Sequence, residues 1–243
     1  VFRLLLADQQ VRFSQHGREL LTQLGSQIAR AGDVQAVRDL AGEVADLPPA
    51  ESSLANAVIR RAALDAGSAE VARTLLACGG RTQEIMEAQL TQARRTVTDE
   101  SKKSAARVSA IRLLSLLDFA DVRPIVLQLL DVREDSSVQR AAINMLGRFD
   151  QLEVAAIILN RWQRFSPQLR SSAVDTLATR PKWLQAFFDA LERGHIRTGE
   201  VDVARIQIFT KHPEASVRQR AVQLFAESRA SESRQKIVTR YQP

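Results

Sequence analysis

The chain has 243 residues, of which 45% are hydrophobic and 26% are charged, a composition typical of a globular protein with a substantial core. No apolar run approaches the roughly 18 residues of a transmembrane helix, and the first ten residues lack the apolar length and cleavage pattern of a signal peptide. A single cysteine excludes an internal disulfide and is compatible with oxidising and reducing compartments alike. Because the chain begins at Val1 and not at methionine, we expect it to be a piece of a longer protein.

The formal net charge of +6 is unevenly distributed along the sequence. Residues 1–98 contain 11 arginines and 11 acidic residues, whereas residues 99–243 contain 23 basic and 17 acidic residues. A basic second half suggests nucleic acid, anionic lipid or an acidic protein as a partner, or else an ordinary solvated surface. We favour the solvated surface because the excess charge is modest.

Helical periodicity predicts every element of the first half. The predicted helices cover 1–31, 34–47, about 53–66, a segment that Gly67 and Ser68 open and Gly79 and Gly80 end, and 82–97. In the first of them Gly17 and Gly25 are weak points, since glycine disfavours a helix. The pair Pro48 and Pro49 ends the second helix, and Ser52 or Ser53 is predicted to cap the third.

A polar, charged segment at 98–104, TDESKKS, is predicted to be an exposed loop. We interpret it as the seam between diverged N-terminal helical repeats at 1–98 and regular repeats at 99–243, with an insertion at 194–213. The helices predicted in the second part are 105–117, 122–130, 138–147, 152–162, 168–179, 182–193, 202–210, 217–226 and 233–240. Pro124 is placed near the start of its helix, while Ser166 and Ser216 are placed as N-caps.

One apolar template recurs in four of these helices and indicates how they pack. Its side chains lie at offsets 0, 4, 5 and 8, which is one stripe of a 3.6-residue helix. The copies are Ala106, Ala110, Ile111, Leu114; Val138, Ala142, Ile143, Leu146; Leu169, Ala173, Val174, Leu177; and Val217, Ala221, Val222, Phe225. Successive copies are 32, 31 and 48 residues apart, counted between equivalent alanines. Because a helix pair cannot bury its apolar face alone, this pattern predicts an all-α fold, an α-solenoid of antiparallel helix pairs that is continuous through both parts.

The run from Val138 to Gly194, with ARIQIFTKHPEASVRQRAV and the closing ESRQKIVTRYQP, resembles the HEAT-repeat region of large multidomain proteins of planctomycetes and verrucomicrobia. In that family a β-propeller of the sugar-dehydrogenase type precedes the repeats, and a c-type cytochrome domain with a CxxCH motif follows them. The resemblance is strongest over 80–243. It implies HEAT-like repeats that act as a non-catalytic scaffold or spacer between these protein domains, in a periplasmic or other extracytoplasmic location.

The sequence itself assigns no cofactor to this chain. Cys78 is followed by Gly79 and does not form a CxxCH motif, so the resemblance implies that haem c belongs only to a cytochrome domain beyond Pro243. We therefore predict no catalytic, cofactor-binding or metal-binding residue here and expect protein domains as partners.

Histidine and cysteine are the first candidates for a reactive or metal-binding site. His16, His195 and His212 are far apart and have no partner at helical spacing, so we interpret them as surface or loop residues and not as metal ligands. Cys78 lies at a helix end in an apolar setting, which favours a packed, inert thiol over a nucleophile.

An acidic cluster, Asp131, Glu134 and Asp135, is a candidate for acid–base chemistry. The same residues precede a helix that starts near Ser137, and carboxylates stabilise the positive N-terminal end of a helix. We favour this capping role.

Two groups mix cations with aromatic rings and support a nucleic-acid-binding alternative. They are Arg161, Trp162, Arg164 and Phe165, and Lys182 with Trp183. Basic helix ends with exposed aromatic rings are how HEAT-like alkylpurine DNA glycosylases hold DNA, so a solenoid of that type is the alternative function. Trp162 nevertheless follows Ile158 by four residues and Trp183 is in phase with Phe187, so we favour core packing and consider nucleic acid the weaker hypothesis.

Arginines near the starts of successive repeat helices form the last candidate. Arg140, Arg170 and Arg218 are expected to line up along the stack. They would form either an anion-binding strip or ion pairs with loop carboxylates such as Asp135 and Glu214, and we favour the ion pairs.

Overall fold

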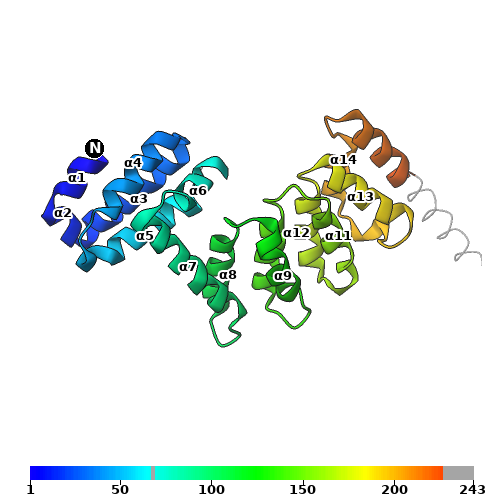
Figure 1. The fold of residues 1–243 in the computed structure, drawn as a ribbon. Helices are drawn as coiled ribbons and strands as arrows, with labels where there is room; N and C mark the ends of the chain where they lie inside the picture. Colours follow the sequence, from blue (N-terminus) through cyan, green and yellow to red (C-terminus); the bar gives the residue numbers. More distant parts are fainter. Residues whose placement is uncertain (67–68, 227–243) are drawn as a thin grey trace, which may run out of the picture. The chain divides into compact units, whose positions relative to one another are not determined.

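The computed structural model describes residues 1–66 and 69–226, in which every regular element is helical (Figure 1). The elements are α1 (Phe2–Ala7), α2 (Gln9–Phe13), α3 (Gln15–Ala31), α4 (Val34–Ala45), the 3-10 turn η1 (Pro49–Glu51), α5 (Ser52–Leu64), α6 (Ala69–Leu76), α7 (Gly80–Thr98), α8 (Ser104–Leu114), α9 (Phe119–Leu129), α10 (Ser136–Leu146), α11 (Glu153–Leu159), the 3-10 turn η2 (Trp162–Arg164), α12 (Pro167–Leu177), α13 (Pro181–Glu192), the 3-10 turn η3 (Thr198–Glu200), α14 (Val203–Thr210) and a helix at 215–226. The predicted helix start at Gly67 and Ser68 and the predicted helix at 233–240 lie outside the described residues.

The chain forms two compact units, Val1–Val122 and Arg123–Pro243, and the division falls within α9. The predicted loop at 98–104 connects α7 to α8 inside the first unit. The predicted contrast between diverged repeats at 1–98 and regular repeats at 99–243 concerns how well each repeat matches the template, and it stays a prediction.

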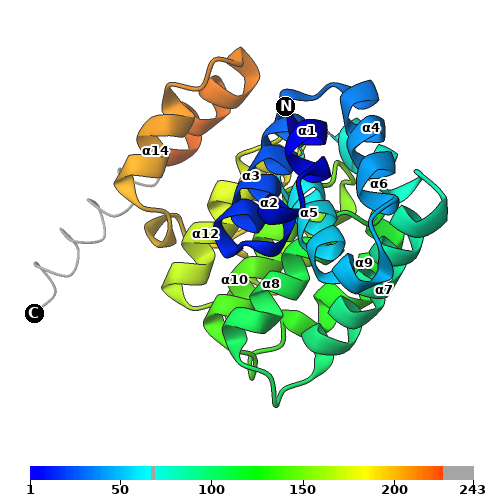
Figure 2. The same cartoon turned by 90° about the vertical axis from the view of Figure 1, so that its left-hand side faces the viewer.

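In the first unit, α3 packs against α5 and α5 packs against α8, so these three helices form one layer. A second layer behind α3 and α5 contains α4, α6 and α7, which contact one another, and α7 also packs closely on α8. At the N-terminal end α1 and α2 lie against α3 (Figure 2). The core of this unit is made by the apolar stripes of α3, α4 and α5, with Leu21, Val44 and Ile59 fully buried.

The prediction of one helix over residues 1–31 is wrong, because two side chains interrupt it. Asp8 Oδ1 accepts a hydrogen bond from the backbone N–H of Gln10 at 2.8 Å, and Ser14 Oγ accepts one from Gly17 at 3.0 Å. Both residues have extended backbone conformations and act as N-caps. The chain therefore turns twice and gives the three helices α1, α2 and α3.

Three further helix starts differ from the prediction. One is Ser216, which lies inside the helix at 215–226 and is not its N-cap. Ser52 does not cap α5, because η1 leads directly into the helix and gives Ser52 helical dihedral angles (φ −56°, ψ −28°). The hydroxyl of Ser53 instead accepts a hydrogen bond from Arg18. Helix α9 begins at Phe119, so Pro124 lies inside it and not in its first turn, and the helix lacks the hydrogen bond that residue 124 would donate.

Glycines 17 and 25 are sites of close packing and not only weak points. A Cβ atom on Gly17 would overlap the backbone carbonyl of Val11, and one on Gly25 would lie 2.9 Å from a methyl group of Val58 in α5. The absence of a side chain thus lets α3 approach its neighbours.

We expect Gly17→Ala to lower the free energy of unfolding by about 1–3 kcal/mol through overpacking. Gly42→Ala is the matched control, because Gly42 lies in α4 with no atom within 4 Å of the added Cβ. There the gain in helix propensity should stabilise the protein by about 1 kcal/mol. Urea denaturation followed by far-UV circular dichroism measures both changes, and a stabilised Gly17→Ala protein would contradict the packing described for α3.

In the second unit, α10 packs on α12, α11 packs on α13, and α12 contacts α13. Its centre is an aromatic cluster of Trp162, Phe187, Phe188 and Phe209, each at most 1% exposed. The ring centroid of Phe187 lies 5.7 Å from that of Trp162, 6.2 Å from that of Phe188 and 6.3 Å from that of Phe209. Tilted and edge-on contacts of this kind stabilise a core beyond the burial of apolar area alone.

A polar side chain anchors the start of each of the four template helices. It stands one position after the first apolar residue of the template and donates to a backbone carbonyl that precedes the helix. The four bonds are Arg107 Nε to Val97 O (3.0 Å), Gln139 Nε2 to Asp131 O, Arg170 Nε to Trp162 O (3.2 Å) and Arg218 Nη1 to His212 O (2.6 Å). Because this hydrogen bond recurs in every helix that carries the template, the repeat is present in the structure as well as in the sequence.

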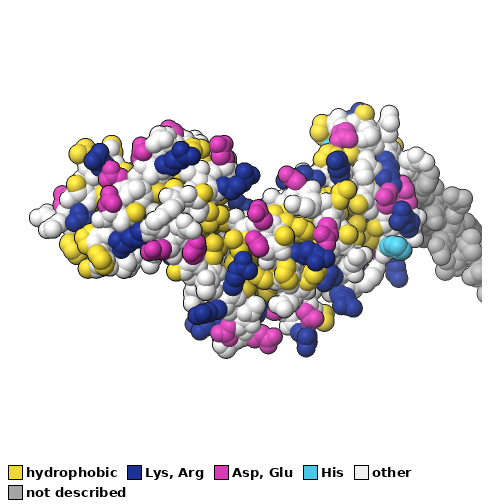
Figure 3. All heavy atoms as spheres, viewed as in Figure 1, with side chains coloured by type: hydrophobic (Ala, Val, Ile, Leu, Met, Phe, Trp, Pro, Cys, Tyr) yellow, Lys and Arg dark blue, Asp and Glu magenta, His cyan; other side chains and the backbone are white. Residues whose placement is uncertain are grey.

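Ion pairs connect successive repeats of the second unit. The partners are about 30 residues apart, which is one repeat: Arg123 with Glu153, Arg180 with Asp150, Arg170 with Glu200, Arg205 with Asp175, and Arg220 with Asp189 and Glu192. Arg205 donates to both oxygens of Asp175, at 2.9 and 2.7 Å, and these bonds raise the pKa of Arg205. These pairs place basic and acidic side chains next to one another on the surface. Figure 3 shows a face on which both kinds are mixed.

Candidate functional site

The histidines and the cysteine are divided between the two units, with His16 and Cys78 in the first and His195 and His212 in the second. His16 and His195 are exposed, and the half-buried His212 accepts a hydrogen bond from the backbone N–H of Glu214 through Nδ1. Within 1–66 and 69–226, no group of three or more His, Cys, Asp or Glu residues is placed to hold a metal ion. Cys78 is half-buried between α6 and α7, and burial raises the pKa of its thiol against the opposing charge of Arg38.

The acidic cluster at 131–135 forms local structure, as the capping interpretation predicts. Asp135 is the N-cap of α10 and accepts hydrogen bonds from the backbone N–H and the hydroxyl of Ser137. Asp131 accepts from the backbone N–H and the guanidinium of Arg133, and these bonds hold the pKa of Asp131 below its ordinary value. The two carboxylates thus have local hydrogen-bond partners.

The aromatic residues that suggested nucleic-acid stacking are in the core. Trp162 is 1% exposed, and its Nε1 donates to Glu200 at 2.6 Å. Trp183 is fully buried and donates to the carbonyl of Gln151, and Phe165 is buried as well. The predicted core packing of both tryptophans is therefore confirmed, and neither ring is accessible to a base.

Arg140, Arg170 and Arg218 do not form one row along the stack. Arg170 and Arg218 occupy the anchoring position of the template, but Arg140 stands one residue later and is exposed. The favoured ion pair with a loop carboxylate forms at Arg170, and within the described residues it does not form at Arg218. Arg170 pairs with Glu200 at 2.8 Å, and Arg218 donates to the carbonyls of His212 and Pro213.

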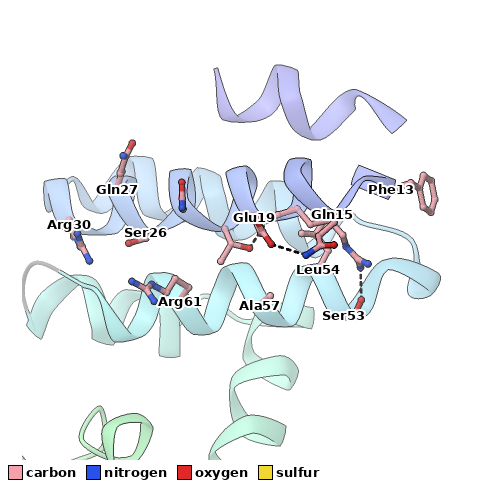
Figure 4. A pocket seen from close by; sticks show the side chains of 13 residues that line it. Phe13, Gln15, Glu19, Ser26, Gln27, Arg30, Ser53, Leu54, Ala57 and Arg61 are labelled. Carbon is pink, nitrogen blue, oxygen red and sulfur yellow. Dashed lines mark hydrogen bonds between the residues drawn. The ribbon is translucent and has the colours of Figure 1, made fainter. Parts of the chain in front are cut away.

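A groove lies between α3 and α5 in the first unit. Its volume is about 800 Å³, and Leu54 and Ala57 of α5 lie on its floor (Figure 4). A second hollow of about 650 Å³, lined by α5, α7 and α8, shares Thr22, Ala57 and Arg61 with the first. The two together form one continuous surface, which we name the arginine groove.

Five arginines line the arginine groove, and they fall into two classes. Arg30 and Arg61 point toward each other from α3 and α5 (Figure 4), and both form ion pairs with Asp65. Burial raises the pKa of Asp65, but hydrogen bonds from Ser26 and Arg61 and the charges of Arg61 and Arg30 outweigh this and lower the pKa. Asp65 thus neutralises part of the charge of this pair.

The other three arginines of the groove have no carboxylate partner within the described residues. The side chain of Arg18 in α3 donates only to the hydroxyl of Ser53, and the exposed side chains of Arg60 in α5 and Arg112 in α8 make no hydrogen bond or ion pair there. The one acidic residue that lines the groove, Glu19, accepts a hydrogen bond from Gln15 at 3.2 Å. The groove therefore has a positive surface.

One wall of the groove carries an unpaired acceptor. Gln89 of α7 donates through Nε2 to the carbonyl of Asn56 at 3.1 Å. Its Oε1 is buried, and it is the one buried side-chain N or O atom in residues 1–66 and 69–226 that has no hydrogen-bond partner. Because this oxygen is buried, it is not accessible to a ligand in the groove.

The arginine groove was not predicted from the sequence. Its residues come from five helices, and no motif along the sequence connects them. The charge balance pointed to the second half, where many arginines form ion pairs between repeats. A helical-wheel comparison of α3 and α5 would have placed Arg18, Thr22 and Ala57 on outward faces, but only their packing puts these faces side by side.

Comparison with known proteins supports the repeat assignment. Residues 89–178, from α7 to the end of α12, match the family model for HEAT repeats. No curated protein was found to match the chain. The predicted fold class, an all-α solenoid of HEAT-like helix pairs, is confirmed, and the chain contains a HEAT-repeat region. Repeats of this kind generally act as scaffolds for protein interaction.

Among the helices in the described part of the chain, none has both the length and the apolar character that a bilayer crossing requires.

Proposed function

We propose that this chain is a non-catalytic HEAT-repeat scaffold that holds protein domains at a set separation and offers them a docking surface. The observation that carries the proposal is the series of ion pairs between successive repeats of the second unit, from Arg123–Glu153 to Arg220–Asp189. Since each pair joins one repeat to the next, it limits how far neighbouring repeats turn relative to each other. A spacer requires this kind of local rigidity.

The resemblance to the planctomycete and verrucomicrobial proteins gives the spacer a specific task. In the full-length protein it would separate a propeller dehydrogenase from a c-type cytochrome, and haem c would belong to the cytochrome alone. Electron transfer slows steeply with distance, so the number of repeats would set the rate between donor and acceptor.

Lengthening the spacer by one repeat in the full-length protein tests this task. A second copy of residues 136–166, which contains α10, α11 and η2, would be inserted after residue 166. We expect substrate-driven reduction of the haem to slow in a stopped-flow experiment, while dye reduction by the dehydrogenase and the haem spectrum stay unchanged. An unchanged haem reduction rate in a folded protein would contradict the spacer function.

A further inference from the structure

We infer that the arginine groove of the first unit binds an acidic, extended peptide segment of a protein partner, whose carboxylates pair with Arg18, Arg60 and Arg112. The inference rests on the proposed scaffold function and names the chemistry of one partner. Three features of the groove support it: the spacing of these arginines, their lack of acidic partners within the described residues and the polar lining between them.

The three arginines are distributed along the groove, one on each helix of a layer. Arg18 belongs to α3, Arg60 to α5 and Arg112 to α8, and α5 packs against both of the other helices. Packed helices are about 8–10 Å apart, so the three cover roughly 20 Å. An extended peptide of about six residues spans this distance. The groove therefore suits a short linear segment that crosses the three helices.

The state of the arginines favours a carboxylate ligand. Arg30 and Arg61 already pair with Asp65, but Arg60 and Arg112 are exposed and make no ion pair within the described residues. A guanidinium group binds a carboxylate through two parallel hydrogen bonds, and neither of these arginines would have to break an existing bond to do so. Arg18 would give up or share its bond to the neutral hydroxyl of Ser53.

The lining between the arginines suits a peptide better than a nucleic acid. Thr22 and Ser109 donate their hydroxyl hydrogens to carbonyls of their own helices, so their oxygens remain as acceptors for the N–H groups of a peptide backbone, and Gln92 adds a side-chain amide. The aromatic ring of Phe13 lies only at one end of the groove (Figure 4), and no other aromatic residue of the described chain lines it, so bases would find no row of rings to stack on.

Fluorescence anisotropy with a labelled peptide of alternating glutamate and alanine tests the inference on the whole chain. We expect the peptide to bind, to bind more weakly as ionic strength rises, and to lose binding when every glutamate is replaced by glutamine. The double variant Arg60→Gln, Arg112→Gln should bind about tenfold more weakly, since each exposed ion pair contributes modestly. Ala57→Glu, which places a negative charge on the floor of the groove, should weaken binding without removing an arginine.

The matched control is Arg140→Gln, Arg148→Gln, which removes the same charge from exposed arginines of the second unit. It should bind the peptide like the unchanged chain, with circular dichroism showing that every variant is folded. Equal loss in the control, or no loss in folded Arg60→Gln, Arg112→Gln, would overturn the inference. Tighter, arginine-dependent binding of a single-stranded oligonucleotide would overturn it in favour of nucleic acid. None of these outcomes changes haem reduction in the lengthened protein, so the spacer function is judged separately.

Discussion

Replacing Phe187 with alanine should lower the free energy of unfolding of the second unit by about 3–5 kcal/mol. Phe187 is fully buried and contacts Trp162, Phe188 and Phe209, so its removal leaves a cavity that three rigid rings cannot fill. Both tryptophans of the chain, Trp162 and Trp183, lie in this unit. Urea denaturation followed by tryptophan fluorescence therefore measures its unfolding selectively.

Ile208→Ala is the matched control for this prediction. Ile208 lies on α14 of the same unit and is 61% exposed, so its truncation should change the free energy of unfolding by no more than about 0.5 kcal/mol. If Phe187→Ala had as small an effect as Ile208→Ala, the aromatic cluster would not be the core of the unit.

Replacing Glu51 with alanine should destabilise the first unit by about 3 kcal/mol. The carboxylate of Glu51 accepts a hydrogen bond from Arg12 Nε at 2.7 Å, and the two side chains are only 5% and 12% exposed. Arg12 would keep its bond to the carbonyl of Leu6, but its charge would remain buried without a counter-charge. Since both tryptophans are in the second unit, far-UV circular dichroism is the appropriate measurement.

The control for Glu51 is an ion pair of the same chemistry in an exposed position. Arg123 and Glu153 are 48% and 45% exposed, and Glu153→Ala should cost less than about 1 kcal/mol. Equal costs for the two substitutions would show that burial does not decide the strength of the Arg12–Glu51 pair.

The sequence predicted the fold class well, because most apolar residues of the template are the residues that the helices bury. Val138, Ala142, Ile143 and Leu146 are all fully buried, as their spacing predicts, whereas Ala106 and Val222 of other copies are exposed. Local errors arose where side chains compete with the helix. Asp8 and Ser14 act as N-caps and interrupt a region whose apolar residues keep helical spacing throughout. These caps depend on hydrogen bonds from side chain to backbone, which the spacing of apolar residues does not reveal.

The candidate site was less predictable, because it depends on which helix faces meet. Residues 1–98 are electrically neutral in sequence, yet Arg18 and Arg60 among them have no carboxylate partner within the described residues. The same holds for Arg112, which follows this neutral part. The second half has the excess of charge, but arginines such as Arg205 and Arg220 form bonds between its repeats. The net charge along the sequence therefore did not locate the unpaired arginines. Whether an arginine has an acidic partner depends on the tertiary structure.

The most direct test of this account is the assignment of the peptide site by nuclear magnetic resonance. The glutamate–alanine peptide would be added to the isotope-labelled chain while backbone amide and arginine side-chain signals are recorded. The account predicts that signals of α3, α5 and α8 around Ala57 shift, together with those of Arg60 and Arg112. Shifts confined to the second unit, or no shifts at peptide concentrations that saturate the anisotropy signal, would contradict it.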